Sequence, residues 1–433
     1  MKTGFSNISL RALTLLSKFA FLLFLGKYSM DESNLGTFGL VVTTIALLIY
    51  VLGFDFYVFN TREILKEGES GMHSKLEGQF VFHLLAYIIV LPISFWAIFY
   101  FNFLDSDLFL VLLLLIISEH LGQELYRVFT TLERSVLANL MLFFRSGLWI
   151  WVVLMDFFLI DNPVDLKRYL WLWAGFSWAS TLVFGSIFLS IIGLGGFKFE
   201  GIDIGFIKRG VRTAGIFFMG SISFQVINFA DRYMIDFFHG KQLLGVYTAY
   251  AQFSNSVEIF TFSAVTMVFY PRLVKTAEEA LQYKRLRRIF FKRSLLTTIL
   301  LIVFVAALAP FFLRFMNKSS FLEELNALYF LLGGSLLLTI SNVYHYDLYV
   351  KKKDRLILTS ALIAMTINVV MNLILIPRYE LIGASIATLF AFLVLAVIKG
   401  VISNKKAIED TIRIDYTAVK GCHRNNNSDR EIL

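Results

Sequence analysis

Residues 356–402 read LILTSALIAMTINVVMNLILIPRYELIGASIATLFAFLVLAVIKGVI, and this stretch decides the fold class. It contains two apolar runs, 356–377 and 381–402, which are separated by only the three residues 378–380. An α-helix needs about 20 consecutive apolar residues to cross the hydrocarbon core of a bilayer. Each run has that length, so the stretch predicts two transmembrane helices joined by a tight turn.

The composition of the whole chain agrees with a membrane protein. Of 433 residues, 57% are hydrophobic and 17% are charged, and the mean hydropathy is +0.70. Soluble domains are nearer half apolar and one quarter charged. The formal net charge of +8 resides largely in short loops between apolar runs, so it does not indicate a nucleic-acid partner. The single cysteine, Cys422, excludes an intramolecular disulfide and a cysteine-based metal site.

Ten further segments have the length of a membrane span. They cover residues 8–28, 35–59, 79–101, 107–130, 136–157, 168–192, 214–237, 243–270, 294–316 and 323–349. With the first two runs they predict an all-α polytopic membrane protein with about twelve transmembrane helices.

Lysine and arginine are distributed unequally between the loops. One set of alternate loops holds about three times as many of them as the other set. Because basic loops stay in the cytoplasm, this bias predicts that both termini are cytoplasmic. The longest basic loop, 271–293, is expected to lie on the inner leaflet as an amphipathic helix.

Two pairs of short, similar segments indicate an internal repeat. Leu35–Phe38 resembles Leu244–Tyr247 near the start of the second and eighth spans, and Glu124–Tyr126 resembles Asp347–Tyr349 in the fourth and tenth. Each pair is six spans apart, which predicts two six-helix lobes related by a pseudo-two-fold axis along the membrane normal. The expected parts are an N-terminal lobe (1–197), a cytoplasmic linker (198–213), a C-terminal lobe (214–402) and a polar cytoplasmic tail (403–433).

Charged side chains inside the spans are the main functional signal. A charge at mid-bilayer costs at least about 2.5–3.5 kcal/mol on insertion scales, so it normally faces the bundle interior or a water-filled cavity. In the first span, Asn7, Arg11, Thr14 and Lys18 recur at helical spacing and form one stripe. We expect five cations to line a polar path for substrate: Arg11, Lys18, Arg127, Arg145 and Arg232.

These cations fit an anionic head group that crosses the membrane. Arginine suits phosphate because its planar fork donates two hydrogen bonds to paired oxygens. The alternative is that the cations form ion pairs between or within helices, for example Lys18 with Glu119 or Arg232 with Asp231.

Three carboxylates inside the spans, Glu119, Asp231 and Glu258, are candidates for ion coupling. A carboxylate in the membrane interior can bind a proton or a sodium ion during transport, or it can serve only as the partner of a nearby cation. The sequence contains no metal-binding or nucleotide-binding motif, so no metal and no cofactor are expected. Histidines inside the spans are expected to hydrogen-bond between helices instead: His83, His120 and His345.

Residues 368–388, NVVMNLILIPRYELIGASIAT, resemble the signature N-xxx-N-x-x-L-I-P-x-[YF]-G-x-x-G-A-A-x-A-T of polysaccharide-type (O-antigen) flippases. These flippases belong to the multidrug/oligosaccharidyl-lipid/polysaccharide exporter superfamily. Two positions depart from the signature: Glu380 replaces the usual glycine, and Ser385 replaces an alanine. Further similarities lie at Asp231–Ile235, Leu244–Tyr250, Tyr270–Pro271 and Glu124–Arg127.

The resemblance implies a two-lobe transporter of a bacterial inner membrane that works by alternating access and is not an enzyme. Its cargo would be an undecaprenyl-pyrophosphate-linked oligosaccharide, moved to the periplasmic leaflet through a lateral opening between the first and seventh helices. H⁺ or Na⁺ would be the coupling ion. Membrane lipids, and possible contact with the polysaccharide polymerase machinery, complete the expected partners, and a monomer is expected.

Three alternatives have distinct sequence signatures. A multidrug extrusion transporter shares the superfamily fold, but a cavity for cationic drugs should be acidic or aromatic. A peptidoglycan lipid flippase usually has two additional helices. A membrane-embedded O-antigen polymerase or ligase would be an enzyme with a large outer loop, whereas no outer loop expected here exceeds about a dozen residues.

Overall fold

The computed structural model describes residues 2–67, 69–160, 163–193, 196–197 and 203–428; the side chains of 2–6, 8, 67, 69–70 and 405–428 lie outside the description. Within these ranges the chain is helical and contains no strand. The first lobe contains α1 (Lys2–Tyr28), α2 (Ser33–Gly53), α3 (Phe56–Glu67), α4 (Glu69–Tyr100), η1 (Ser106–Leu108), α5 (Phe109–Thr131), α6 (Ser135–Phe143), the π segment η2 (Phe144–Leu148), α7 (Trp149–Ile160) and α8 (Leu166–Ile192).

The second lobe follows the same plan. It contains α9 (Ile204–His239), α10 (Lys241–Thr261), the π segment η4 (Phe262–Thr266), α11 (Met267–Lys275), α12 (Ala280–Phe315), α13 (Ser320–Glu323), α14 (Leu325–Val350) and α15 (Asp354–Ser428). Among the described residues, eleven helical stretches are long and apolar enough to cross a membrane. The last of these is broken at Glu380, where the backbone leaves the helical region, so it holds two spans. The predicted all-α membrane fold is therefore confirmed.

Two boundaries differ from the sequence-based expectation. Helix α9 begins at Ile204, within the segment expected to be a linker. Phe206, in its first turn, is buried against Phe56 and Phe59 of α3, so this turn is packed on the first lobe. The separate surface helix expected over 271–293 is wrong: α11 continues to Lys275, and the basic residues from 284 onward form the first turns of α12.

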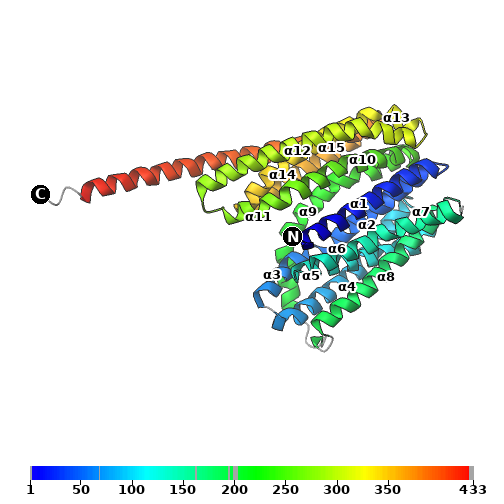
Figure 1. Cartoon of the computed structure of the whole chain (residues 1–433), viewed down its shortest axis with the longest axis horizontal. Helices are drawn as coiled ribbons and strands as arrows, with labels where there is room; N and C mark the ends of the chain where they lie inside the picture. The colour runs from blue at the N-terminus through cyan, green and yellow to red at the C-terminus, as the bar shows by residue number, and fades with distance from the viewer. Residues whose placement is uncertain (1, 68, 161–162, 194–195, 198–202, 429–433) are drawn as a thin grey trace.

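The two lobes converge at one end and diverge at the other (Figure 1). The converging end carries the α1–α2 turn, α7 and α13. Both termini, α3 and α11 lie toward the diverging end, which we call the basic end because the Lys/Arg-rich loops are there. Helix α9 joins the lobes and begins beside α3.

The lobes are joined where α2 crosses α10. A Cβ atom added to Gly36 would lie 2.0 Å from the carbonyl oxygen of Lys241, and one added to Gly245 would lie 2.3 Å from that of Glu32. Each added Cβ would also lie 3.2 Å from the backbone nitrogen of the other glycine. The similar segments 35–38 and 244–247 are therefore in contact with each other, and only glycine permits this close approach of the two backbones.

Side chains reinforce the same junction. Ser320 of α13 donates a hydrogen bond to Glu32 (2.9 Å), and Gln242 of α10 donates one to Asp31 (3.3 Å). The hydroxyl and the backbone N–H of Ser33 also donate to Asp31, and they lower the pKa of its carboxyl group. The apolar core is continuous across this junction, because Leu35 and Leu244 belong to one buried cluster.

The second pair of similar segments, 124–126 and 347–349, also occupies equivalent positions in the two lobes. Glu124 of α5 accepts a hydrogen bond from Gln79 of α4 (2.6 Å). Asp347 of α14 accepts one from Tyr283 of α12 (2.6 Å) and one from Ser403 of α15 (2.6 Å). In each lobe a buried carboxylate of the fourth span thus links to the third, which agrees with the predicted repeat.

The turn between the last two spans has a backbone geometry that favours glycine at position 380, where the flippase signature has glycine and this chain has glutamate. Glu380 has φ +50° and ψ −126°, a region that residues other than glycine rarely adopt. Gly383, three residues later, has no room for a side chain, since an added Cβ would lie 2.5 Å from the carbonyl oxygen of Leu375. The turn between the two spans is therefore present, but Glu380 adopts a strained backbone conformation in it.

The α2–α10 crossing can be tested with alanine substitutions. We expect Gly36→Ala and Gly245→Ala each to lower stability by about 1–3 kcal/mol, the usual cost of overpacking, because backbone atoms block the new methyl group. The measurement is the melting temperature of the purified protein in detergent. Gly175→Ala is the control, because a Cβ there meets nothing within 4 Å. Equal melting temperatures for all three variants would contradict the close crossing.

Glu380→Gly should have the opposite effect. Removing a left-handed non-glycine residue is expected to raise the free energy of unfolding by about 1 kcal/mol, because strain of this kind costs about 1–3 kcal/mol. Glu380→Gln serves as the control, since it removes the charge beside His239 but keeps the strained backbone. If the glutamine variant gains as much stability as the glycine variant, the charge and not the backbone is responsible.

Candidate functional site

A cavity of about 550 Å³ lies between the lobes toward the basic end. The first lobe contributes Tyr50, Asp55, Tyr57 and Val58 to its wall. The second lobe contributes α9, α10, α14 and α15, with the following polar side chains: Ser221, Gln225, Glu258, Asn342, His345, Tyr346, Tyr349, Asp354 and Lys399. The cavity therefore has walls from both lobes.

The charges on this wall differ from the predicted set. Three are acidic, Asp55, Glu258 and Asp354, and one is basic, Lys399. Of these four, sequence reasoning singled out only Glu258. Lys399 could have been found from the sequence, because it is a lone lysine inside the twelfth apolar run. Asp55 lies at the break between α2 and α3.

A smaller cavity of about 30 Å³ lies within the second lobe. Glu258 lines both cavities, and Asp231 and Arg232 of α9 line the smaller one. Glu258 has no hydrogen bond or ion pair with any described residue, whereas Asp231 accepts a hydrogen bond from Tyr247 and lies 3.6 Å from Arg232. Two of the three predicted coupling carboxylates, Glu258 and Asp231, thus line the same small cavity.

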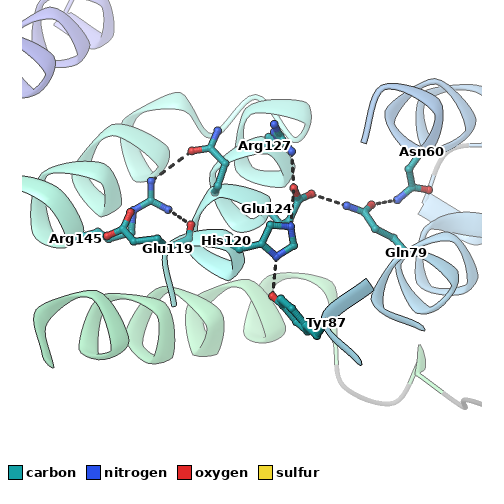
Figure 2. A network of polar contacts seen from close by, with 9 residues as sticks. Asn60, Gln79, Tyr87, Glu119, His120, Glu124, Arg127 and Arg145 are labelled. Atoms are coloured by element: carbon teal, nitrogen blue, oxygen red, sulfur yellow. Dashed lines mark hydrogen bonds and ion pairs between the residues drawn. The ribbon is translucent and has the colours of Figure 1, made fainter. Parts of the chain in front are cut away.

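Arg145 forms a buried ion pair with Glu119. Its Nε lies 3.1 Å from the Glu119 carboxylate, and its Nη1 donates a hydrogen bond to the Glu119 carbonyl oxygen at 2.9 Å (Figure 2). Arg145 lies in the π segment η2, a widened turn of the kind that often occurs at functional sites. Trp173 and Ser177 of α8 also donate to Glu119, so the pair ties three helices together. Glu119 is therefore paired with Arg145, not with Lys18.

Three other predicted cations also have partners. Arg127 donates a hydrogen bond to Glu124 at 2.5 Å and lies over the ring of Tyr57. Arg232 donates to the backbone of α9 beside Asp231. Arg11 donates to Asn139 at 2.9 Å and to Tyr126, and one Nη atom lies 3.6 Å from the sulfur of Met267 in the second lobe. Arg11 thus spans the lobe interface.

Lys18 is the exception. Its side chain is exposed, and no described residue forms a hydrogen bond or an ion pair with it. The neighbouring residues Leu15, Leu16 and Phe19 of α1 line an apolar groove of about 250 Å³, whose other walls are α10 and α12. The lateral opening was expected between the first and seventh helices, but the groove lies beside the eighth and ninth.

Comparison with known proteins gives matches in structure. An inward-facing multidrug resistance MATE family transporter of the MOP superfamily superimposes with a TM-score of 0.71, at 13% identity, covering 94% of this chain and 98% of that one. The lipid II flippase MurJ in an inward closed conformation gives 0.69 at 18% identity, covering 92% and 86%. This chain has the same fold as these two transporters. An outward-facing MATE transporter gives 0.62 at 14% identity, covering 93% of each chain.

Sequence comparisons add nothing to this result: no family model and no curated protein matches the chain. At these identities the structural likeness establishes the fold of a multi-pass membrane transporter. The cargo is a separate question, because transporters with the same fold carry different substrates.

The Arg145–Glu119 pair yields a test. Arg145→Ala should lower stability by about 3–5 kcal/mol, because it leaves a buried carboxylate without its cation. Arg145→Met combined with Glu119→Gln should recover much of the loss, since glutamine can still accept hydrogen bonds from Trp173 and Ser177. The measurement is the melting temperature in detergent.

Lys167→Ala is the control for a cation in an exposed ion pair. Its partner is Asp107 at 3.0 Å, and such pairs contribute at most about 1 kcal/mol. If Arg145→Ala is as mild as this control, Arg145 is not a structural residue, and the substrate role predicted for it gains support.

Proposed function

We propose that the chain is a flippase that moves a lipid-linked oligosaccharide with an anionic pyrophosphate head group from the cytoplasmic to the periplasmic leaflet of a bacterial inner membrane. The cargo class is undecaprenyl-pyrophosphate-linked oligosaccharide, such as an O-antigen or capsule repeat unit. The protein acts as a monomer by alternating access, beside the polymerase machinery that uses its product. Both termini are cytoplasmic, so the inter-lobe cavity opens on the side where such lipids are assembled.

The observation that carries this proposal is Lys18 beside the apolar groove. A lipid-linked sugar needs a cationic contact for its phosphates next to an apolar surface for its hydrocarbon chain. Lys18 is exposed and without an ion pair among the described residues, and three of its neighbours on α1 line the groove. The groove wall is almost wholly apolar, with Gln252 and Ser256 as its polar members.

The inter-lobe cavity supports the sugar part of the cargo. A volume of about 550 Å³ is within the range of small-molecule sites, and its wall mixes tyrosine rings with amide and hydroxyl groups. Asn342 and Gln225 can both donate to and accept from sugar hydroxyls. Lys399 offers a second cation for a phosphate inside the cavity.

Ion coupling is assigned to Glu258 and Asp231. Glu258 faces both cavities without a partner among the described side chains, so binding of H⁺ or Na⁺ there would change the charge of the cavity wall. Asp231 lines the smaller cavity together with Glu258. Glu119, which is held by Arg145, is a less suitable coupling site in this conformation.

A second candidate, extrusion of cationic drugs, is favoured by one observation. The inter-lobe cavity has three carboxylates against one lysine, together with phenylalanine and tyrosine rings such as Phe217 and Tyr346. Acidic and aromatic walls suit organic cations. The multidrug transporters among the structural neighbours make this alternative worth testing directly.

The test reconstitutes the protein in liposomes that contain an undecaprenyl-pyrophosphate-linked oligosaccharide and measures flipping by access of a glycosidase. We expect Lys18→Ala to lower the rate about tenfold or more, because a hydrogen bond to a charged group is worth about 1.5–3 kcal/mol. Lys18→Arg should retain activity, and Lys167→Ala should not change it.

Drug transport is measured in parallel with Glu258→Gln and Asp55→Asn. If the wild type fails to move the lipid-linked sugar but exports organic cations, and these two variants lose export, the multidrug alternative replaces the flippase.

A further inference from the structure

We propose that His83, His120 and Glu124 form a binding site for a divalent transition-metal ion of the zinc type inside the first lobe. His83 lies on α4, and His120 and Glu124 lie one turn apart on α5. One ligand atom from each residue lies within 4.8 Å of the other two, and all three residues are buried. The sequence-based expectation gave these histidines only a role in helix contacts.

Both imidazoles have an unused nitrogen. The Nε2 atoms of His83 and His120 are buried and form no hydrogen bond with any described group. An unpaired buried nitrogen is costly, so native proteins rarely leave two of them together without an occupant. The Nε2 of His120 lies 3.9 Å from a carboxylate oxygen of Glu124, which is too far for a hydrogen bond and leaves room between them.

The surrounding residues prepare His120 to act as a ligand. Its Nδ1 lies 2.6 Å from the hydroxyl of Tyr87 (Figure 2). When Nδ1–H donates to Tyr87, the lone pair of Nε2 is free to bind a metal ion. Gln79 donates to the other oxygen of Glu124 and so orients the carboxylate. Metal-binding histidines and carboxylates are usually oriented by partners of this kind.

Space for an occupant exists beside Gly53 at the end of α2. A Cβ atom added there would lie 3.5 Å from Glu124 Oε1 and 3.6 Å from His120 Nε2. A small crevice of about 10 Å³, lined by Tyr57, Gln79 and Arg127 among others, reaches Glu124. Because Tyr57 also lines the inter-lobe cavity, an ion could approach from that side.

The donor set matches one known class of zinc site. Two histidines and one glutamate bind zinc with a fourth position left to water, at distances of about 2.0–2.2 Å. The three ligand atoms must therefore move closer together when an ion binds. Arg127 opposes this step, because its guanidinium already donates to Glu124 at 2.5 Å and repels a cation. Neutralising Arg127 should consequently strengthen binding.

The experiment uses the full chain, purified without a polyhistidine tag, stripped with a chelator and titrated with Zn²⁺ and Co²⁺. We expect one ion per chain, visible cobalt absorption typical of low coordination number, and an X-ray absorption spectrum of the zinc form that contains two imidazole ligands. Wild-type protein that binds less than a stoichiometric amount, or a coordination sphere without imidazole, would overturn the site.

Variants locate the ion. His83→Ala and His120→Ala should each lower the affinity about a hundredfold, and Tyr87→Phe about tenfold, the range seen when an orienting partner is lost. His73→Ala is the control on the same helix α4, because its ring hydrogen-bonds the Ile192 carbonyl oxygen at the basic end. Affinity that is unchanged in both ligand variants would place the ion elsewhere.

Two further variants remain informative if the histidine variants fail to fold. Gly53→Ala meets only ordinary contacts in this structure, so it should fold but should weaken metal binding by filling the space. Arg127→Gln should tighten binding. Changes in the same direction for both variants would contradict the site. None of these measurements depends on transport, so they test the metal site independently of the proposed flippase activity.

Discussion

The close crossing of α2 and α10 is the constraint on which the rest of the structure depends. Gly36 and Gly245 bring two helix backbones into contact at the converging end, where the lobes share one apolar core. Because the helices meet there and diverge elsewhere, the space between the lobes opens toward the basic end. In this structure the contact closes the space between the lobes at the converging end. If the chain works by alternating access, as proposed, these glycines are the contact that would have to separate.

Each lobe is held together as a body by buried carboxylates with partners on neighbouring helices. In the first lobe, Glu119 binds Arg145 and Glu124 accepts a hydrogen bond from Gln79, and in the second, Asp347 accepts hydrogen bonds from Tyr283 and Ser403. Such pairs are costly to separate inside a protein, so they favour movement of whole lobes over movement of single helices. Four of the five predicted cations have a partner in this structure, whereas Lys18 forms no hydrogen bond or ion pair with a described residue. Lys399 in the cavity wall likewise forms none with a described residue.

The two hollows between the lobes differ in chemistry. The groove between α1, α10 and α12 is apolar, whereas the inter-lobe cavity has polar side chains and more acidic than basic groups. Lipid-linked cargo would use both surfaces, but a cationic drug would need only the cavity. The first lobe adds a polar cluster around Glu124 that neither cargo requires, and its two unpaired imidazole nitrogens point to a metal ion. The same carboxylate thus belongs to the packing of the lobe and to the proposed metal site.

The sequence by itself determined the number and type of elements, because helix length and hydropathy are local properties that bilayer thickness constrains directly. It also located the repeat and the turn at position 380. At this position the flippase signature has glycine, and Glu380 has a strained backbone conformation. Only the tertiary structure decided which charges meet. Arg145 and Glu119 are 26 positions apart, and their pairing depends on how two helices are rotated and how the π segment turns one of them. Lys399 and Asp55 reach the cavity for the same reason: a side chain's environment is set by helix packing, which a one-dimensional pattern of charges does not contain.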